Sequence, residues 1–325
     1  MSKKVMIILC FLCLLLSYFT FVSAEKAFQS DSQMPQATDS NEVKYRLVLI
    51  TQELETPFWD RVGEGAKEQA QREGASLEVW GSYGNNQEDF LKKIEIALHS
   101  KVDGIIVQGL DTEEFKNLTK VKAAFYGIPI ITVANDVPMN ESLRKTYVGS
   151  DQQLAGKLLA KQLLSDMGHK GNVIILGDRD QLYYQEQRLQ GVLDILKGYP
   201  NIKTLYAETS EAKEQVTATT QELLNQLPDV DAFIAINANN AGAMIEEIGR
   251  RFQVSLFHIY SFDDGSDSLA LLKQGKLDGM IEQSPKIMGE RSVNLMMKWL
   301  TDENVPLNME GYLTSIRVVK ARDAK

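Results

Sequence analysis

The chain alternates short apolar runs with amphipathic stretches from residue 45 onward, and this alternation limits the possible folds more than any other feature. The runs that are short enough for buried strands lie at residues 45–50, 76–80, 102–107 and 130–133. The stretches between them that show helical period lie at residues 58–73, 88–100 and 112–126. Strands that alternate with helices form βαβ units around a parallel sheet, so the sequence predicts an α/β fold.

The second half of the chain repeats this plan. Its expected strands are residues 171–176, 203–207 and 230–236, and its expected helices are residues 183–196 and 211–227. The related strand sequences VDGIIV and VDAFIAI begin at Val102 and Val230, and Gly65 and Gly191 each stand early in the first helix of a half. This weak similarity predicts two lobes of one design. A ligand would bind in the cleft between them, and the lobes would close about hinge loops.

The amino-terminal segment has a different character. A basic start precedes an apolar run at residues 5–22, and small residues follow it, which is typical of a secretory signal peptide. The run also reaches the lower length limit for a spanning helix, so an uncleaved membrane anchor is the alternative. Residues 1–24 are therefore expected to be a signal peptide or an anchor, and the polar residues 25–43 a flexible tether. Either way, the positive flank predicts an extracytoplasmic location for the rest of the chain.

Charge and motifs argue against several function classes. The net charge of −9 disfavours a nucleic-acid partner. The sequence has neither a phosphate-binding loop nor a nucleophile elbow, and its three histidines lack metal-ligand spacing. The adjacent carboxylates of Asp263 and Asp264 leave an acid–base mechanism open, although loop carboxylates are more often caps or hydrogen-bond acceptors. We expect a binding protein with no metal and no cofactor, not an enzyme.

Polar and aromatic side chains gather where the expected strands end, at the edge of a doubly wound sheet that holds ligands. They are Phe58 and Trp59 after Pro57, then Asn135, Asp136, Arg188, Asn237, Asn239, Asp263 and Gln283. Amides, carboxylates and a guanidinium suit sugar hydroxyls, and rings suit the C–H faces of a sugar. The same residues would also serve as helix caps, and the two rings as core for the first helix.

From about residue 44 to about residue 319 the chain resembles the type I periplasmic sugar-binding proteins, the ribose- and galactose-binding group that shares its fold with the LacI-type repressor core. The resemblance rests on TPFWDRVGEGAKEQA (56–70), VDGIIVQG (102–109), GIPIITVANDVP (127–138), YVGSDQQLAGKLLAKQL (147–163), QRLQGV (187–192), VDAFIAINANNAGA (230–243), FDDG (262–265) and GKLDGMIEQSP (275–285). It implies two Rossmann-like lobes with parallel sheets, joined by a three-crossing hinge. The implied lobes are residues 44–149 plus 284–312 and residues 150–283 plus 313–325.

The resemblance also implies ligand-binding residues. By matching motif positions, these are Thr56, Phe58, Trp59, Arg188, Asn237, Asp263 and Gln283, with the two rings enclosing the sugar. Two positions depart from the family pattern, because Ala134 and Ala238 stand where the family commonly has aspartate. Asn135 and Asp136 are the candidates to replace the first of these. A hydrogen bond to a charged group contributes about 1.5–3 kcal/mol, so simple loss of both aspartates would weaken binding of a ribose-like ligand.

The function implied by the resemblance is binding of a monosaccharide by an extracytoplasmic protein that delivers it to an ABC permease. The alternative is a membrane-anchored sugar sensor that signals to a histidine kinase or a chemoreceptor. The apolar run and the absence of a lipid-attachment motif around Cys10 and Cys13 favour the sensor. A LacI-type repressor is disfavoured, because a signal-like sequence stands where a DNA-binding segment would be expected.

Overall fold

The computed structural model describes residues 15–19, 44–83, 86–179, 182–210, 212–303 and 305–323. The chain divides into an amino-terminal unit, residues 1–42, and a folded unit, residues 43–325. In the first unit, residues 15–19 are helical and exposed. Among the described residues, no helix combines the length and apolarity that a membrane crossing needs. The predicted signal peptide or anchor lies outside the described residues apart from 15–19, and the predicted tether lies outside them entirely.

The folded unit contains two six-stranded sheets, which confirms the predicted α/β fold with two lobes. The first sheet has the strand order β11-β5-β4-β3-β1-β2, and the second has β12-β10-β9-β8-β6-β7. The strands of the first are β1 (Arg46–Glu53), β2 (Ser76–Ser82), β3 (Gly104–Gln108), β4 (Ile130–Ala134), β5 (Thr146–Gly149) and β11 (Tyr312–Leu313). Those of the second are β6 (Gly171–Asp178), β7 (Ile202–Thr209), β8 (Ala232–Ala235), β9 (His258–Phe262), β10 (Gly279–Glu282) and β12 (Arg317–Lys320). The described pairings are parallel except that of β10 with β12.

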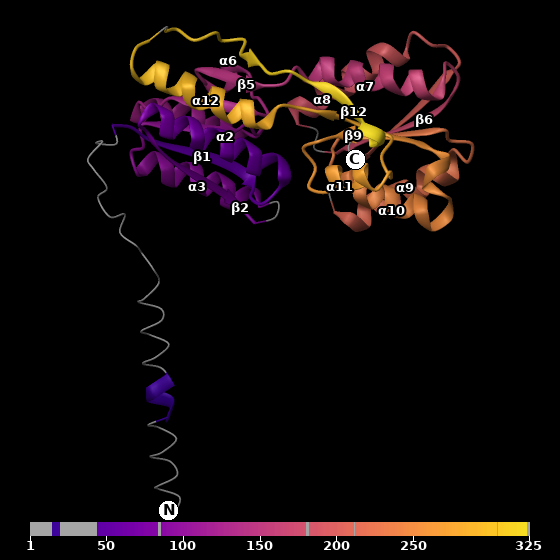
Figure 1. Ribbon diagram of the computed structural model, residues 1–325, viewed down its shortest axis with the longest axis horizontal. Helices are drawn as coiled ribbons and strands as arrows, with labels where there is room; N and C mark the ends of the chain where they lie inside the picture. The colour runs from indigo at the N-terminus through magenta and orange to yellow at the C-terminus, as the bar shows by residue number, and fades with distance from the viewer. Residues whose placement is uncertain are drawn as a thin grey trace, which may run out of the picture. The chain divides into compact units, whose positions relative to one another are not determined.

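Helices accompany both sheets, and Figure 1 shows the elements gathered into the two lobes. The first lobe has α2 (Pro57–Glu73), α3 (Gln87–His99), α4 (Glu113–Asn117), α5 (Ala123–Tyr126), α6 (Met139–Ser142) and α12 (Pro285–Leu300). The second lobe has α7 (Gln152–Met167), α8 (Tyr183–Leu196), α9 (Lys213–Gln226), α10 (Asn240–Arg251) and α11 (Ser268–Lys273). The helix expected at residues 112–126 is interrupted between α4 and α5 by a π-helical turn, Leu118–Lys122.

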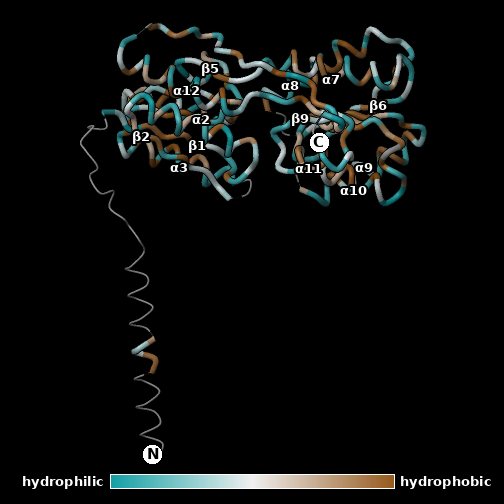
Figure 2. Tube along the Cα trace, viewed as in Figure 1, coloured by the Kyte–Doolittle hydropathy of each residue, from teal (hydrophilic) through white to brown (hydrophobic). Residues whose placement is uncertain are grey.

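The core lies on both faces of each sheet because alternate strand residues point to opposite sides. In β1, Leu47 and Leu49 join one buried cluster while Val48 and Ile50 join another. The strand β6 repeats this arrangement in the second lobe with two further clusters. Hydrophobic stretches accordingly occur in both halves of the folded unit (Figure 2). These nearly continuous apolar strands are what a parallel sheet covered on both faces requires.

The chain passes between the two sheets three times: after β5, between β10 and α12, and between β11 and β12. Hydrogen bonds join these segments, since the Thr314 amide donates to the Gly149 carbonyl over 2.7 Å and Ser284 Oγ donates to the Ser315 carbonyl over 2.8 Å. The lobe boundaries stay a prediction. Leu313, which that division assigns to the second lobe, pairs with Gly149 in the first sheet.

Candidate functional site

A cavity of about 560 Å³ lies between the lobes, at the carboxyl ends of the strands. This is the edge where ligands of open α/β sheets bind. Its first-lobe wall consists of Gln52, Glu53, Phe58, Trp59, Gln87, Gln108, Leu110, Asp111, Thr112 and Asn135. Its second-lobe wall consists of Asp178, Leu182, Tyr184, Thr209, Ser210, Asn237, Ala238, Asn239 and Asp264. We call this space the interlobe cavity.

The two aromatic residues that open α2 reach the interlobe cavity. Thr56 caps the helix by accepting the Trp59 amide over 3.2 Å, and Pro57 occupies its first turn. The rings of Phe58 and Trp59 meet edge to face, with centroids 5.3 Å apart. Both side chains also belong to a buried core cluster, with exposed fractions of 3% and 7%. Phe58 and Trp59 can therefore both pack in the core and line a ligand site, which are the two roles that the sequence left open.

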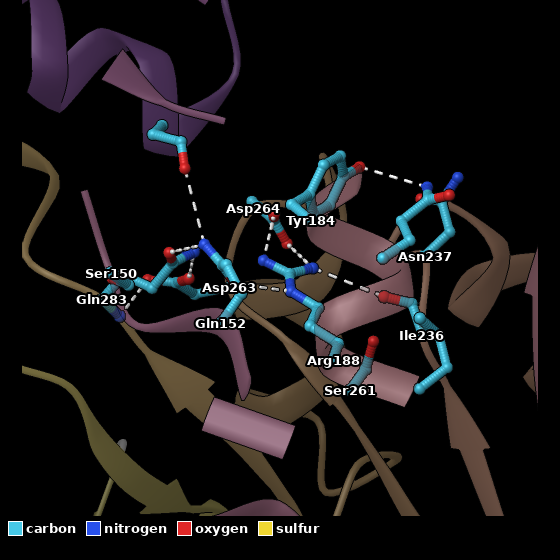
Figure 3. Close-up of polar contacts among 12 residues, drawn as sticks. Ser150, Gln152, Tyr184, Arg188, Ile236, Asn237, Ser261, Asp263, Asp264 and Gln283 are labelled. Carbon is cyan, nitrogen blue, oxygen red and sulfur yellow. Dashed lines mark hydrogen bonds and ion pairs between the residues drawn. The ribbon is translucent and has the colours of Figure 1, made fainter. Parts of the chain in front are cut away.

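The guanidinium of Arg188 is fully buried beside the cavity but does not line it. It stacks on Phe262 and Tyr184, 3.9 Å and 4.8 Å from the ring centroids. Its Nη1 and Nη2 donate to the two Asp264 carboxylate oxygens over 3.2 Å and 2.7 Å, and its Nε donates to Gln152 Oε1 over 2.8 Å (Figure 3). A bidentate pair of this kind fixes both partners in orientation.

Asp263 and Gln283 are engaged with each other and lie outside the cavity lining. The Gln283 amide donates to Asp263 Oδ2 over 2.8 Å, and Gln283 Nε2 donates to Asp263 Oδ1 over 2.9 Å. Gln152 Nε2 donates to Gln283 Oε1 over 3.2 Å and to the Ala134 carbonyl over 3.4 Å. Burial, reinforced by the charge of Asp264, raises the pKa of Asp263 to about 7.

The carboxylate of Asp136 does not replace the aspartate that is missing at position 134. It accepts from Arg144 Nε over 2.6 Å and from Arg144 Nη2 over 2.7 Å, and it also accepts from Thr132 Oγ1. Burial raises the pKa of Asp136, and the Arg144 charge opposes that rise. The residue lines a separate hollow of about 530 Å³. Its charge is thus neutralised within the protein, away from the interlobe cavity.

An acidic residue outside the predicted set, Asp178, lies at the end of β6 and lines the interlobe cavity. Its carboxylate accepts from Gln185 Nε2 over 2.8 Å, from Asn240 Nδ2 over 2.7 Å and from Asn237 Nδ2. The signal for it was present in the sequence. Asp178 stands one residue beyond an apolar run, and Asn135 and Asn237 follow such runs directly.

Five of the ten candidate site residues named from the sequence line the interlobe cavity: Phe58, Trp59, Asn135, Asn237 and Asn239. The other five, which lie near it or apart from it, are Thr56, Asp136, Arg188, Asp263 and Gln283. Their roles as ligand contacts stay predictions. The side chains that line the cavity include the carboxylates of Glu53, Asp111, Asp178 and Asp264, and none of these lining residues is a lysine, arginine or histidine. Among the described residues there is also no cluster of histidine, cysteine and acidic side chains suited to a metal ion.

Comparisons with known proteins agree with this architecture. The ribose import binding protein RbsB of Bacillus subtilis is 22% identical over 290 residues, which cover 89% of this chain and 90% of that protein. The glucose-galactose binding protein GanP of Geobacillus stearothermophilus superposes with a TM-score of 0.78 at 28% identity, over 86% of this chain and 98% of GanP. An ABC transporter solute-binding protein of Actinobacillus succinogenes with bound D-allose has a TM-score of 0.75 at 26% identity, over 86% and 99% of the two chains.

A family model adds the last piece of evidence. It describes the periplasmic binding protein domain and matches residues 47–304, which is most of the folded unit. The two parallel sheets, the cavity between them and the similar solved structures agree with that match. The chain therefore belongs to the periplasmic binding protein domain family.

Proposed function

We propose that this protein is an extracytoplasmic sugar-binding protein, the substrate-binding component of an ABC transporter, and that it binds a monosaccharide in the interlobe cavity. One observation carries the proposal: two aromatic rings, Phe58 and Trp59, face a cavity whose other walls are mainly amides, hydroxyls and carboxylates. Rings match the C–H faces of a sugar, and the polar groups match its hydroxyls. A cavity of about 560 Å³ falls within the usual range for small-ligand sites.

The relatives support transport over the sensor alternative. RbsB is named a ribose import binding protein, and the protein with bound D-allose is a component of an ABC transporter. Membership of the periplasmic binding protein domain family supports an extracytoplasmic location and a binding role. The membrane partner we propose is a permease that recognises the closed, sugar-bound form. Attachment through the amino terminus stays a prediction.

Thermal unfolding of the purified protein with D-ribose, D-glucose, D-galactose and D-allose tests the proposal. A ligand at about 1,000 times its dissociation constant adds about 4.1 kcal/mol to the free energy of unfolding. At roughly 2–4 °C per kcal/mol, the midpoint would rise by about 8–16 °C. A rise with one of these sugars that is lost in Trp59→Ala supports the proposal. No rise with any of them at millimolar concentration would contradict monosaccharide binding of this class.

A further inference from the structure

An exposed aromatic surface lies at the amino-terminal ends of the first-lobe strands, opposite the end that holds the interlobe cavity. The segments that precede β3 and β4 and the end of α12 form a groove of about 640 Å³ there. Its lining includes the rings of Phe125, Tyr126 and Trp299 and the side chain of Lys101. The exposed fraction of Phe125 is 82%, and its ring lies 5.3 Å from that of Tyr126. Adjoining exposed rings indicate an interaction surface, which we call the aromatic groove.

Four cations surround the aromatic groove, and none of them forms an ion pair with an acid in the described part of the chain. They are Lys44, Arg46, Lys101 and Lys145. Arg46 Nη2 donates to the Lys101 carbonyl over 2.8 Å, which places both at the groove wall. Lys145 Nζ lies 4.5 Å from the centroid of the Trp299 ring. The groove thus combines aromatic rings with positive charge.

Acidic side chains are few at this end of the lobe. The groove lining contains one, Asp103, whose carboxylate already accepts the Arg46 backbone amide over 2.7 Å. Asp302 and Glu303 follow α12 and do not line the groove. The interlobe cavity, in contrast, is lined by four carboxylates and by no lysine or arginine. The aromatic groove is therefore the positive end of a lobe in a chain whose net charge is −9.

The chain also enters the folded unit at this face. Lys44 is the first described residue of that unit, and its Nζ lies 5.3 Å from the centroid of the Tyr45 ring. The Tyr45 hydroxyl donates to the carbonyl of Leu300, a groove residue, over 3.4 Å. The apolar run at residues 5–22, the predicted signal peptide or anchor, precedes this point in the sequence. If that run holds the chain to a membrane, it joins the domain on the side of the groove.

We propose that the aromatic groove rests on an anionic phospholipid surface, with Phe125 and Tyr126 at the headgroups and with Lys44 and Lys101 beside lipid phosphates. Aromatic rings prefer the membrane interface, and lysines near an anionic surface are attracted to it. The interlobe cavity lies at the opposite end of the strands, so this contact leaves it open to the sugar. The inference concerns a surface separate from the sugar site and does not depend on which sugar binds.

Amide hydrogen exchange of the full chain on vesicles tests the proposal, because it reports which face is covered even if the amino-terminal run also inserts. The vesicles are phosphatidylcholine alone, or equal parts of phosphatidylcholine and phosphatidylglycerol. We expect slower exchange of residues 98–103 and 122–128 on the anionic vesicles than on the neutral ones, with α10 of the second lobe unchanged as the reference. The difference should disappear in about 1 M salt, where the Debye length is only about 3 Å.

A matched pair of double variants tests the role of the lysines. Each lysine at an anionic surface contributes about fivefold in binding, equivalent to about 1 kcal/mol. Lys44→Gln with Lys101→Gln should therefore lower the ratio of partition onto anionic and neutral vesicles about 25-fold. The control is Lys170→Gln with Lys203→Gln, which removes the same charge from exposed second-lobe lysines. An equal loss in the control would show a general charge effect and overturn the proposal.

Other occupants of the aromatic groove give different results. Slower exchange of residues 98–103 and 122–128 that appears without vesicles, and increases with protein concentration, would make the groove an interface between two copies and overturn the proposal. Exchange that is the same on anionic and neutral vesicles would also overturn it. Because the exchange comparison uses the wild-type chain, it decides the question even if a variant fails to fold.

Discussion

Ionisation of Asp263 should make the stability of the protein depend on pH. Its pKa is about 7 in the folded protein and about 3.9 in an unfolded chain. Between these values the folded state holds a proton that the unfolded state has lost, so the free energy of unfolding decreases as pH rises from about 4 to about 7. The slope from this group is at most about 1.4 kcal/mol per pH unit. Urea denaturation across this range should show the slope in the wild type and its loss in Asp263→Asn, whereas parallel curves would contradict the assignment.

Single residues also show where sequence reasoning reached its limit. The ends of apolar runs correctly marked the cavity edge, so Asn135 and Asn237 could be selected without a structure. The family resemblance selected Asp263 of the adjacent pair, whereas Asp264 is the one that lines the cavity, because one residue of turn geometry exchanges their directions. The engagement of Asp136 by Arg144 was equally hidden, since it depends on how the loop after β4 folds back. Element types follow from local periodicity, whereas side-chain partners depend on tertiary contacts.

At the scale of elements, the first turn of α2 depends on its cap. Thr56 is buried, and its hydroxyl accepts the Trp59 amide over 3.2 Å. Thr56→Ala should lower the free energy of unfolding by about 1 kcal/mol, and Thr56→Ser should retain most of it. Urea denaturation measures both variants. The family resemblance implies a ligand contact at Thr56, and sugar affinity distinguishes that role from capping. If Thr56 acts only as a cap, Thr56→Ala should reduce sugar affinity less than Trp59→Ala does. An equal loss would indicate direct contact with the sugar.

Each lobe also contains a helix pair whose close approach requires glycine. A Cβ on Gly65 of α2 would lie 2.1 Å from the Lys286 carbonyl oxygen of α12, and a Cβ on Gly191 of α8 would lie 2.1 Å from that of Gln153 in α7. The equivalent placement of these two glycines, noticed in the sequence, thus has a packing reason. Gly65 and Gly191 have similar positions in the two halves of the sequence because each allows a close helix–helix contact in its own lobe.

Gly191→Ala should be strongly destabilising, because the added methyl group meets backbone and not a movable side chain. Overpacking typically costs about 1–3 kcal/mol, measurable by urea denaturation. Sugar affinity should fall as well, since the Arg188 carbonyl lies in the same helix contact, 2.1 Å from a Cβ placed on Gly156. Gly198→Ala is the control, because its Cβ would meet the Ile195 carbonyl oxygen at an ordinary 3.4 Å. Equal stability of the two variants would contradict the packing argument.

At the scale of the whole folded unit, the ligand site depends on both lobes, because neither lobe alone supplies all its walls. The first lobe provides the aromatic rings, and the second provides Asp178, Asn237 and Asp264. The three connecting segments are short and hydrogen-bonded to one another through Gly149, Thr314 and the Ser284–Ser315 pair. Such an arrangement allows the lobes to move about a small hinge while each keeps its own core.

Hydrogen exchange can test whether the sugar engages both lobes. With a saturating sugar, slower amide exchange is expected in the Trp59 segment of the first lobe and in the Asn237 and Asp264 loops of the second, because the ligand excludes water from both walls and stabilises the closed form. The matched reference is α9, which contributes nothing to the cavity lining and should exchange unchanged. Protection confined to one lobe would mean that the sugar binds without closure, and the permease would then have no closed form to recognise.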